Sequence, residues 1–397
     1  MTCTVRWGYN FILRKHTNEG VKSLIVMSNK VREKGRTEKM IFSVFADLHY
    51  KKGMYAVSVS DMEEILKKAH ENQADFIIHA GDLCNDYVGS PELINTYLKN
   101  KYDIPVYGIY GNHELESSGN SMEAVTPLLT NDENVIWGTK DGKMGDGSIG
   151  YYYFEKEGYR IICTDTNYSY NEELSIWEHN KTASWGAPAG NKATNSLGPE
   201  QLIWLENVLM DAAAKGISCI VMSHASFTDM WYLSLGDNPY KYLWHTSPDT
   251  EAVQKIFRKV NEITPRTVIM SINGHYHTNR VALKDNIVYF DVNTVINGSW
   301  LPDMAPHYTE EHEFVLEKYD KNGEKCGEKV VPLSKLWQSS NTHYFESPLS
   351  AIVKIEDDGI IEIKGTKTKW RYGVVPDNQN PGCMPEISDC YFVLDNV

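Results

Sequence analysis

The feature that most constrains this chain is a repeated local pattern, in which a run of apolar, strand-forming residues ends at a short polar cluster. The pattern occurs five times, at Asp47-Leu48-His49, Gly81-Asp82, Gly111-Asn112-His113-Glu114, His224 and Gly274-His275-Tyr276-His277. In an open α/β sheet, side chains just past the carboxyl ends of the strands converge on one crevice. We therefore expect the five clusters to form a single site.

Strands and helices alternate along the chain after Met40. The apolar runs predict strands at 40–46, 75–80, 104–110, 217–223 and 267–272, and helices at 58–73 and 197–215. This alternation indicates an α/β sandwich. Further strand-like runs, which suggest two sheets, lie at 151–154, 159–164, 286–292 and 313–319. Residues 349–364 read as a hairpin around the turn at Gly359.

The composition divides at Met40. Residues 1–39 carry nine basic and three acidic side chains, whereas the rest carries 30 basic and 50 acidic side chains, a net charge of −20. We predict that residues 1–39 are an N-terminal extension outside the core, with a packed N-terminal arm as the alternative. Residues 40–335 are predicted to form the main domain, and residues 336–397 a C-terminal β-hairpin extension packed on it.

The net charge and the length of the apolar runs limit the classes of partner that the chain can bind. A body of net charge −20 disfavours nucleic acid, because affinity for nucleic acid depends mostly on Lys and Arg that neutralise phosphates. No apolar run approaches the ~20 residues of a membrane-spanning helix. The first 39 residues do not resemble a signal peptide, and the seven cysteines form no C-x-x-C pair, so we expect a cytoplasmic protein with reduced cysteines. Nothing in the sequence indicates an oligomeric state.

The polar clusters offer a set of metal ligands with nitrogen and oxygen donors and no thiolate. Such donors suit Mn, Fe or Zn in a reactive site. Seven side chains exceed what one ion needs, whereas two ions that share a carboxylate, ~3.5–4 Å apart in hydrolytic sites, would use them all. We therefore predict two divalent or mixed-valence transition metal ions. The candidate ligands are Asp47, His49, Asp82, Asn112, His224, His275 and His277.

The ordered blocks D-x-H, G-D, G-N-H-(E/D), H and G-H-x-H resemble those of the calcineurin-like metallophosphoesterase superfamily. The resemblance covers about residues 40–300 and includes a Q-x-x-W-L helix at residues 201–205. It implies a four-layer α/β/β/α sandwich, here with a C-terminal β-rich extension. The activity that it implies is that of a dinuclear metal-dependent phosphoric ester hydrolase.

The resemblance also implies a role for each position. Asp47, His49 and His277 would hold one metal ion, and Asn112, His224 and His275 the other. Asp82 would bridge the two ions. His113 would hydrogen-bond a phosphate oxygen or protonate the leaving group.

One position departs from the family pattern. Many members read G-D-x-x-D, and the last Asp supports the catalytic histidine, but this chain has Asn85 there. An amide accepts a hydrogen bond but does not stabilise an imidazolium by charge. The candidates for this supporting role are therefore Asn85 itself, Asp86 and Glu114.

We expect an enzyme that hydrolyses a small phosphate ester through a metal-bridging hydroxide. Sites for monoesters often add cationic clamps, and no Arg lies within two residues of a candidate ligand, so a phosphodiester is slightly favoured. The alternatives are a phosphomonoesterase or nucleotidase on the same site, and a catalytically silent scaffold with this fold. Two aromatic-rich insertions, residues 167–196 and 226–247, either pack loops onto the sandwich, the favoured reading, or stack a base or sugar beside the site.

Overall fold

The computed structural model describes most of the chain from residue 39 onward. The described residues are 39–117, 119–171, 174–179, 195–228, 247, 249–299, 308–336, 342–376 and 384–395. The prediction for the N-terminal extension falls on residues outside these ranges, except at Lys39.

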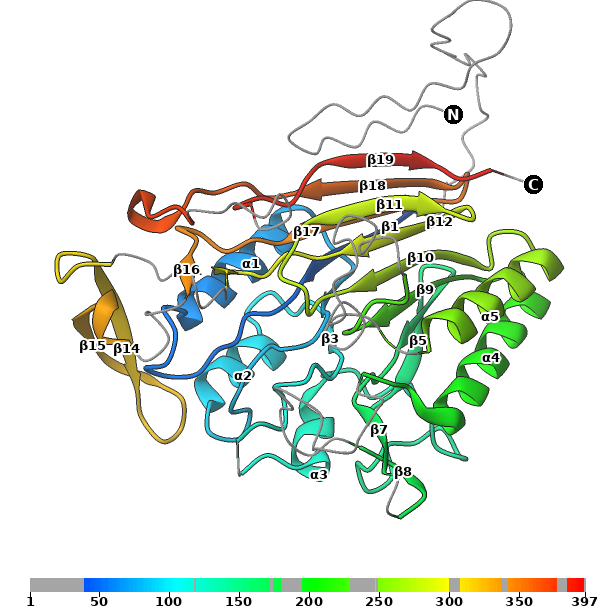
Figure 1. The fold of residues 1–397 in the computed structure, drawn as a ribbon, viewed down its shortest axis with the longest axis horizontal. Coiled ribbons are helices and arrows are strands. Elements are labelled where there is room, and N and C mark those ends of the chain that lie inside the picture. Colours follow the sequence, from blue (N-terminus) through cyan, green and yellow to red (C-terminus); the bar gives the residue numbers. More distant parts are fainter. Residues whose placement is uncertain are drawn as a thin grey trace, which may run out of the picture.

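Two β-sheets form the centre of the molecule (Figure 1). The six-stranded sheet has the order β19 (Cys390–Val393), β18 (Ile360–Gly365), β17 (Ala351–Glu356), β1 (Lys39–Phe45), β2 (Phe76–His79) and β3 (Val106–Gly108). The seven-stranded sheet has the order β11 (Arg280–Lys284), β12 (Ile287–Asp291), β10 (Val268–Asn273), β9 (Ser218–Ser223), β6 (Tyr159–Cys163), β5 (Tyr152–Lys156) and β4 (Ile136–Trp137). In each sheet the central strands run parallel.

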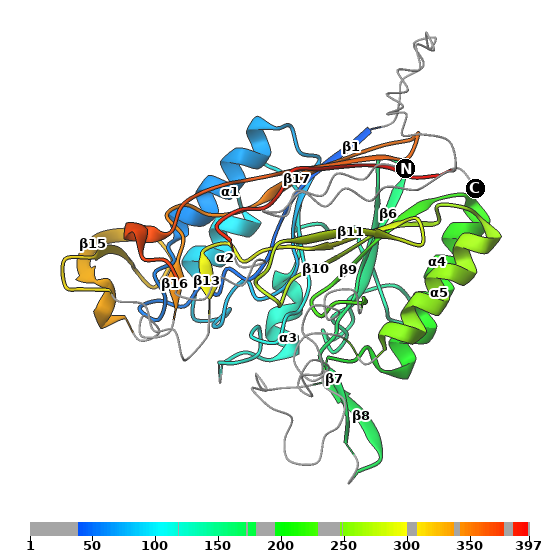
Figure 2. The same ribbon diagram turned by 45° about the horizontal axis from the view of Figure 1, so that its top comes forward.

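Helices cover the outer faces of the two sheets. Helices α1 (Val59–Glu71) and α2 (Pro91–Leu98) lie beside the six-stranded sheet, and α4 (Gly198–Lys215) and α5 (Thr250–Ile263) beside the seven-stranded sheet (Figures 1 and 2). Strand β9 shows how the layers pack, because Ile220 and Met222 join the core between the sheets, whereas Cys219 and Val221 join the core under α4 and α5. The predicted α/β/β/α sandwich is confirmed.

The C-terminal hairpin is part of the six-stranded sheet. Strand β17 pairs antiparallel with β1, so that Val44 lies opposite Ala351, and β18 and β19 follow it to the edge of the sheet. The predicted C-terminal β-rich region is therefore present and completes the sheet that contains β1. The boundaries drawn at residues 39 and 335 stay a prediction.

Shorter elements surround the sandwich. They are α3 (Met122–Val125), the β7–β8 hairpin (Tyr168–Asn171 and Ile176–His179), the β14–β15 hairpin (Glu313–Tyr319 and Lys325–Pro332), the pair β13 (Asn297–Ser299) and β16 (His343–Tyr344), and single 3-10 turns at Thr126–Leu128, Leu333–Lys335 and Arg371–Gly373. The sequence analysis did not predict α2, α5, β11, β15 or β19. In the described part of the chain, no helix combines the length and the apolar character needed to cross a bilayer.

Candidate metal centre

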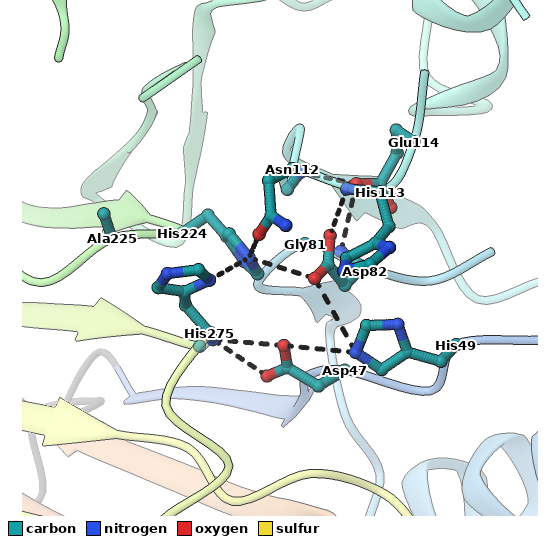
Figure 3. A network of polar contacts seen from close by, with 12 residues as sticks. Asp47, His49, Gly81, Asp82, Asn112, His113, Glu114, His224, Ala225 and His275 are labelled. Carbon is teal, nitrogen blue, oxygen red and sulfur yellow. Dashed lines mark hydrogen bonds and ion pairs between the residues drawn. The ribbon is translucent and has the colours of Figure 1, made fainter. Parts of the chain in front are cut away.

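The loops that follow β1, β2, β3, β9 and β10 meet at one edge of the two sheets. Backbone hydrogen bonds join the first two loops, from the amide of Asp47 to the carbonyl of Gly81 (3.1 Å) and from the amide of His49 to the carbonyl of Asp82 (2.9 Å). The loop after β10 joins them through the amide of His275, which donates to the Asp47 carboxylate at 3.0 and 3.1 Å. The structure thus brings together all five polar clusters (Figure 3).

Two glycines allow this close approach. A Cβ atom at Gly81 would lie 2.3 Å from Nδ1 of His224, and one at Gly111 would lie 2.2 Å from Oδ1 of Asp82. Both contacts are far too short for any side chain. The glycines in the G-D and G-N-H blocks are therefore required by packing around the site.

His224 shows why a cation fits here. Its Nδ1 lies 2.8 Å from the carbonyl of Ala80, which can only accept, so Nδ1 carries a proton and Nε2 is the ring atom that faces the site. Three further potential ligand atoms surround Nε2, namely Asn112 Oδ1 at 3.0 Å, His275 Nδ1 at 3.1 Å and Asp82 Oδ2 at 3.2 Å. A cation at this point would satisfy all four donors.

A second convergence lies around His49. Its Nδ1 lies 3.1 Å from Oδ1 of Asn85, which orients Nε2 toward the site. His49 Nε2 then lies 3.1 Å from Nε2 of His277, 3.7 Å from Oδ2 of Asp82 and 3.9 Å from Oδ1 of Asp47. His277 Nε2 is itself 3.5 Å from Oδ1 of Asp47.

The two convergences share Asp82. Ligand atoms of Asp47, His49 and His277 lie within 4.8 Å of one another, as do those of Asp82, His224 and His275. A third such group joins Asp82 and His49 to His113. Asp82 therefore lies between the two sets of donors, where a bridging carboxylate would be placed.

The electrostatics of the site also favour a cation. Burial opposes the charged form of His224, but the Asp82 carboxylate outweighs it and raises the pKa of His224 to about 10. Burial would likewise raise the pKa of Asp82, but its histidine neighbours hold it well below the usual range. Burial lowers the pKa of His49. In the absence of a metal, the Asp82–His224 pair thus holds a proton where a metal ion fits.

Several candidate ligands have an unusual backbone conformation. Asp47, His49, Asp82, His275 and His277 all lie in the left-handed region, with φ between 52° and 72°. Few non-glycine residues adopt this conformation, and strained residues concentrate at functional sites. The five strained residues lie on three different loops, so the strained conformation is a feature of the whole site and not of a single turn.

Glu114 holds the loops together beneath the ligands. Its Oε2 accepts hydrogen bonds from the amides of Gly111 (2.6 Å) and Asp82 (3.1 Å), and its Oε1 accepts one from the amide of Leu83 (2.7 Å). Burial and the nearby charge of Asp82 raise the pKa of Glu114. The backbone N–H groups oppose this rise, because they use both carboxylate oxygens as acceptors. Glu114 therefore fixes the backbone that carries Asp82 and Asn112.

Comparison with known proteins identifies the family. A family model described as calcineurin-like phosphoesterase matches residues 40–279, more than half of the chain. The chain belongs to the calcineurin-like phosphoesterase family. Members of this family are metal-dependent phosphoester hydrolases, and the expected resemblance is confirmed. None of the curated proteins matches the sequence at a significant level.

Solved structures resemble this phosphoesterase over most of its length. A dimetal phosphatase from Danio rerio is 14% identical, with a TM-score of 0.52, and the match covers 90% of this chain and 99% of that one. GAP50, the anchor in the inner membrane complex of Plasmodium, is 9% identical, with a TM-score of 0.40 and coverage of 90% and 89%. The phosphopantetheinyl hydrolase of Mycobacterium tuberculosis is 12% identical, with a TM-score of 0.34 and coverage of 65% and 91%. The Danio rerio match supports the fold alone.

A carboxylate that the sequence analysis did not single out lies next to His113. Glu116 Oε2 lies 3.0 Å from His113 Nδ1, in a contact three residues along the chain. The charges of Asp82 and Glu116 raise the pKa of His113 against the effect of burial. A carboxylate three residues after the histidine of the G-N-H block is the sequence signal that could have pointed to Glu116.

The other candidates for that role have different contacts. Asn85 lies 3.1 Å from His113 Nδ1 through its amide nitrogen. Asp86 Oδ1 accepts a hydrogen bond from the amide of Gly89, and Glu114 binds backbone amides as described above.

The two aromatic-rich insertions are described only in part. Tyr170 and Trp177 lie on the β7–β8 hairpin, with their rings 5.6 Å apart. Most of the other residues of these insertions lie outside the described ranges.

Proposed function

We propose that this phosphoesterase hydrolyses a small phosphate ester with two transition metal ions. The observation that carries the proposal is the pair of converging donor sets that share Asp82. One ion would satisfy only one set, whereas two ions account for both and for the position of the shared carboxylate.

The proposed ligands follow from the geometry together with the family. Asp47, His49 and His277 would hold one ion, and Asn112, His224 and His275 the other, with Asp82 between them. The metal would be Mn, Fe or Zn, because all the donors are imidazole, carboxylate or amide. When bound, the ions would polarise the phosphoryl group and lower the pKa of a water molecule that attacks phosphorus.

The chain itself contributes orientation and a proton. The Nδ1 atom of His224 binds the carbonyl of Ala80, and the Nδ1 atom of His49 binds Oδ1 of Asn85. These contacts fix the tautomers so that each Nε2 faces the site. His113 is buried beside His49, with their ring centroids 4.8 Å apart, and its amide donates to Asp82 Oδ1 at 2.8 Å. We assign His113 the protonation of the leaving oxygen, or a hydrogen bond to a phosphate oxygen.

The distribution of arginines supports a diester substrate over a monoester. Arg266 precedes β10, at the end opposite to the metal centre, and Arg258 pairs with Asp285 on the outer surface at 3.8 Å. Arg280 is buried at the start of β11, with its guanidinium 4.3 Å from the centroid of the Tyr276 ring. These contacts do not suggest a cationic clamp for a dianionic monoester. A phosphomonoesterase or nucleotidase activity is the alternative.

Metal analysis and hydrolysis measured on the same sample test the proposal. We expect two transition ions per chain, and loss of bis(4-nitrophenyl) phosphate hydrolysis after chelation. His275→Ala should lose metal and activity, whereas the control His70→Ala, on the exposed face of α1, should keep both. Full activity of metal-free protein would refute the proposal, and two bound ions without hydrolysis of any ester would favour the silent scaffold.

A cytoplasmic location is part of the proposal. The buried cysteines Cys84, Cys163 and Cys219 are free thiols, as is usual in a reducing compartment. Fractionation of the source cells with an antibody to the protein would test it.

A further inference from the structure

We propose that Glu116 is the positioning residue for His113, and that it replaces the carboxylate that many family members carry at the position of Asn85. This inference rests on the proposed function. It concerns which side chain orients the proton donor, and not how the metals are held.

The geometry places one carboxylate oxygen against two donors. Oε2 of Glu116 lies 3.0 Å from Nδ1 of His113 and 2.5 Å from Nδ2 of Asn85. The two nitrogens are 3.1 Å apart. Three polar atoms in such close contact need a consistent assignment of protons.

His49 fixes that assignment. Asn85 Oδ1 lies 3.1 Å from Nδ1 of His49, so the amide oxygen is the atom that accepts from His49 and the NH₂ group points the other way. An NH₂ group cannot accept the proton of His113 Nδ1. A carboxylate oxygen only accepts, so the contact between Glu116 Oε2 and His113 Nδ1 places a proton on that nitrogen, and Asn85 and His113 are two donors on one acceptor, Glu116.

The loop that carries Glu116 is fixed to the loop that carries Asn85. The amide of Glu116 donates to the carbonyl of His113 at 3.0 Å, and the hydroxyl of Ser117 donates to the carbonyl of Asn85 at 2.8 Å. His113 is buried, and the Glu116 side chain is only 24% exposed. Glu116 is thus held in place, and a negative charge remains next to His113 although position 85 is neutral.

A positioned proton donor matters most for esters with a strongly basic leaving group. A nitrophenolate departs with little help, whereas a phenolate or an alkoxide needs its proton in the transition state. Loss of Glu116 should therefore depress kcat/KM for the poor leaving group far more than for the good one. A merely structural role would lower both by the same factor.

The experiment compares the phenyl and 4-nitrophenyl esters of one phosphodiester, with Glu116→Gln and Glu116→Ala tested against the exposed control Glu133→Gln. We expect Glu116→Gln to lower kcat/KM for the phenyl ester roughly ten- to a hundred-fold, and for the nitrophenyl ester by less than about threefold. The metal content should stay at the wild-type level, and Glu133→Gln should match the wild type. Equal losses on the two esters would overturn the inference.

Moving the carboxylate gives a second readout. The variant Asn85→Asp/Glu116→Gln returns the charge to the position that other family members use, also 3.1 Å from His113 Nδ1. We expect it to recover at least about a tenth of the wild-type rate on the phenyl ester, if the missing charge is what slows Glu116→Gln. No recovery in a folded, metal-replete double variant would contradict the proposal.

Failure of the proposed function gives a different result. If the wild-type protein hydrolyses no ester, the phosphoesterase proposal fails, and the contact is then read directly from ¹⁵N-histidine spectra of the full chain. The Nδ1–H signal of His113 should shift in Glu116→Gln and stay unchanged in Glu133→Gln. An unchanged signal in Glu116→Gln would show that Glu116 does not hold His113.

Discussion

Replacing Glu114 with Gln tests whether one buried carboxylate holds the loops of the metal centre together. Both oxygens of Glu114 accept from backbone amides, and three amides share them. Gln can keep two of these bonds by turning its oxygen toward Gly111 and Asp82. Its NH₂ group then faces the amide of Leu83, so that two donors meet without an acceptor.

The magnitude follows from these contacts. A buried N–H left without an acceptor costs about 1–3 kcal/mol, and two bonds that change from charge-assisted to neutral lose roughly 1 kcal/mol each. Relief of the repulsion between Glu114 and Asp82 offsets part of this loss. We therefore expect Glu114→Gln to lower the free energy of unfolding by about 2–4 kcal/mol.

Urea unfolding of the metal-free proteins at pH 7 measures this difference, with Glu133→Gln as the matched control on an exposed loop. The control should lie within about 0.5 kcal/mol of the wild type, as exposed substitutions usually do. Metal affinity should also fall in Glu114→Gln, because the Asp82 and Asn112 backbone shifts. A loss under about 1 kcal/mol would mean that Glu114 is held as a neutral acid, which Gln mimics, and would refute the reasoning.

Other predictions follow from the same structure. Asp82→Ala should remove both ions, whereas His113→Ala should keep both ions and slow turnover roughly 10²–10⁴-fold. Metal analysis and kcat, measured on each variant, distinguish the two effects. Loss of an ion from His113→Ala would show that His113 is a metal ligand. Burial lowers the pKa of His79 to about 3, so the folded state keeps it neutral while the unfolded chain protonates near pH 6.5. Below pH 6.5 the free energy of unfolding of the wild type should therefore fall by up to ~1.4 kcal/mol per pH unit more than that of His79→Gln. Urea unfolding at a series of pH values measures both, and an equal pH dependence of the two proteins would refute the neutral, buried state of His79. Deleting residues 1–38 should leave activity and unfolding unchanged, whereas deleting residues 349–397 removes β17, β18 and β19 from the six-stranded sheet and should give insoluble protein; a soluble product from the second deletion would contradict the role of that hairpin.

Local patterns predicted most of the sandwich because burial leaves a direct signature in sequence. The helix expected at residues 58–73 is α1, and its buried residues, among them Val59, Met62 and Ile65, recur at helical spacing. Helix α5 has equally regular buried positions at Val253, Phe257 and Val260, and the sequence analysis did not predict it. Strand β19 was missed because it has only four residues, Cys390–Val393, and so short an apolar run does not identify a strand by its periodicity.

The candidate ligands could be named from the sequence because each follows the end of a strand. The carboxyl ends of parallel strands share one edge of a sheet, so the order of the strands places Asp47 near Asp82 after β1 and β2, and His224 near His275 after β9 and β10. The packing of the two sheets against each other then brings the two pairs together. Their roles as ligands stay a prediction. The sequence carries no measure of how near Glu116 approaches His113, since the three-residue separation is also compatible with a carboxylate turned toward solvent.

The sequence by itself determined the fold class, the family and the set of polar residues at one edge of the sheets, because these depend on strand periodicity and on short motifs within single loops. Only the tertiary structure decided how the side chains interact. Contacts between loops far apart in sequence give Asp82 its place between two donor sets and commit Glu114 to backbone amides. They also orient Asn85 through His49, which leaves Glu116 as the acceptor for His113. Each of these outcomes depends on distances of a few ångströms between separate loops, which local sequence patterns do not encode.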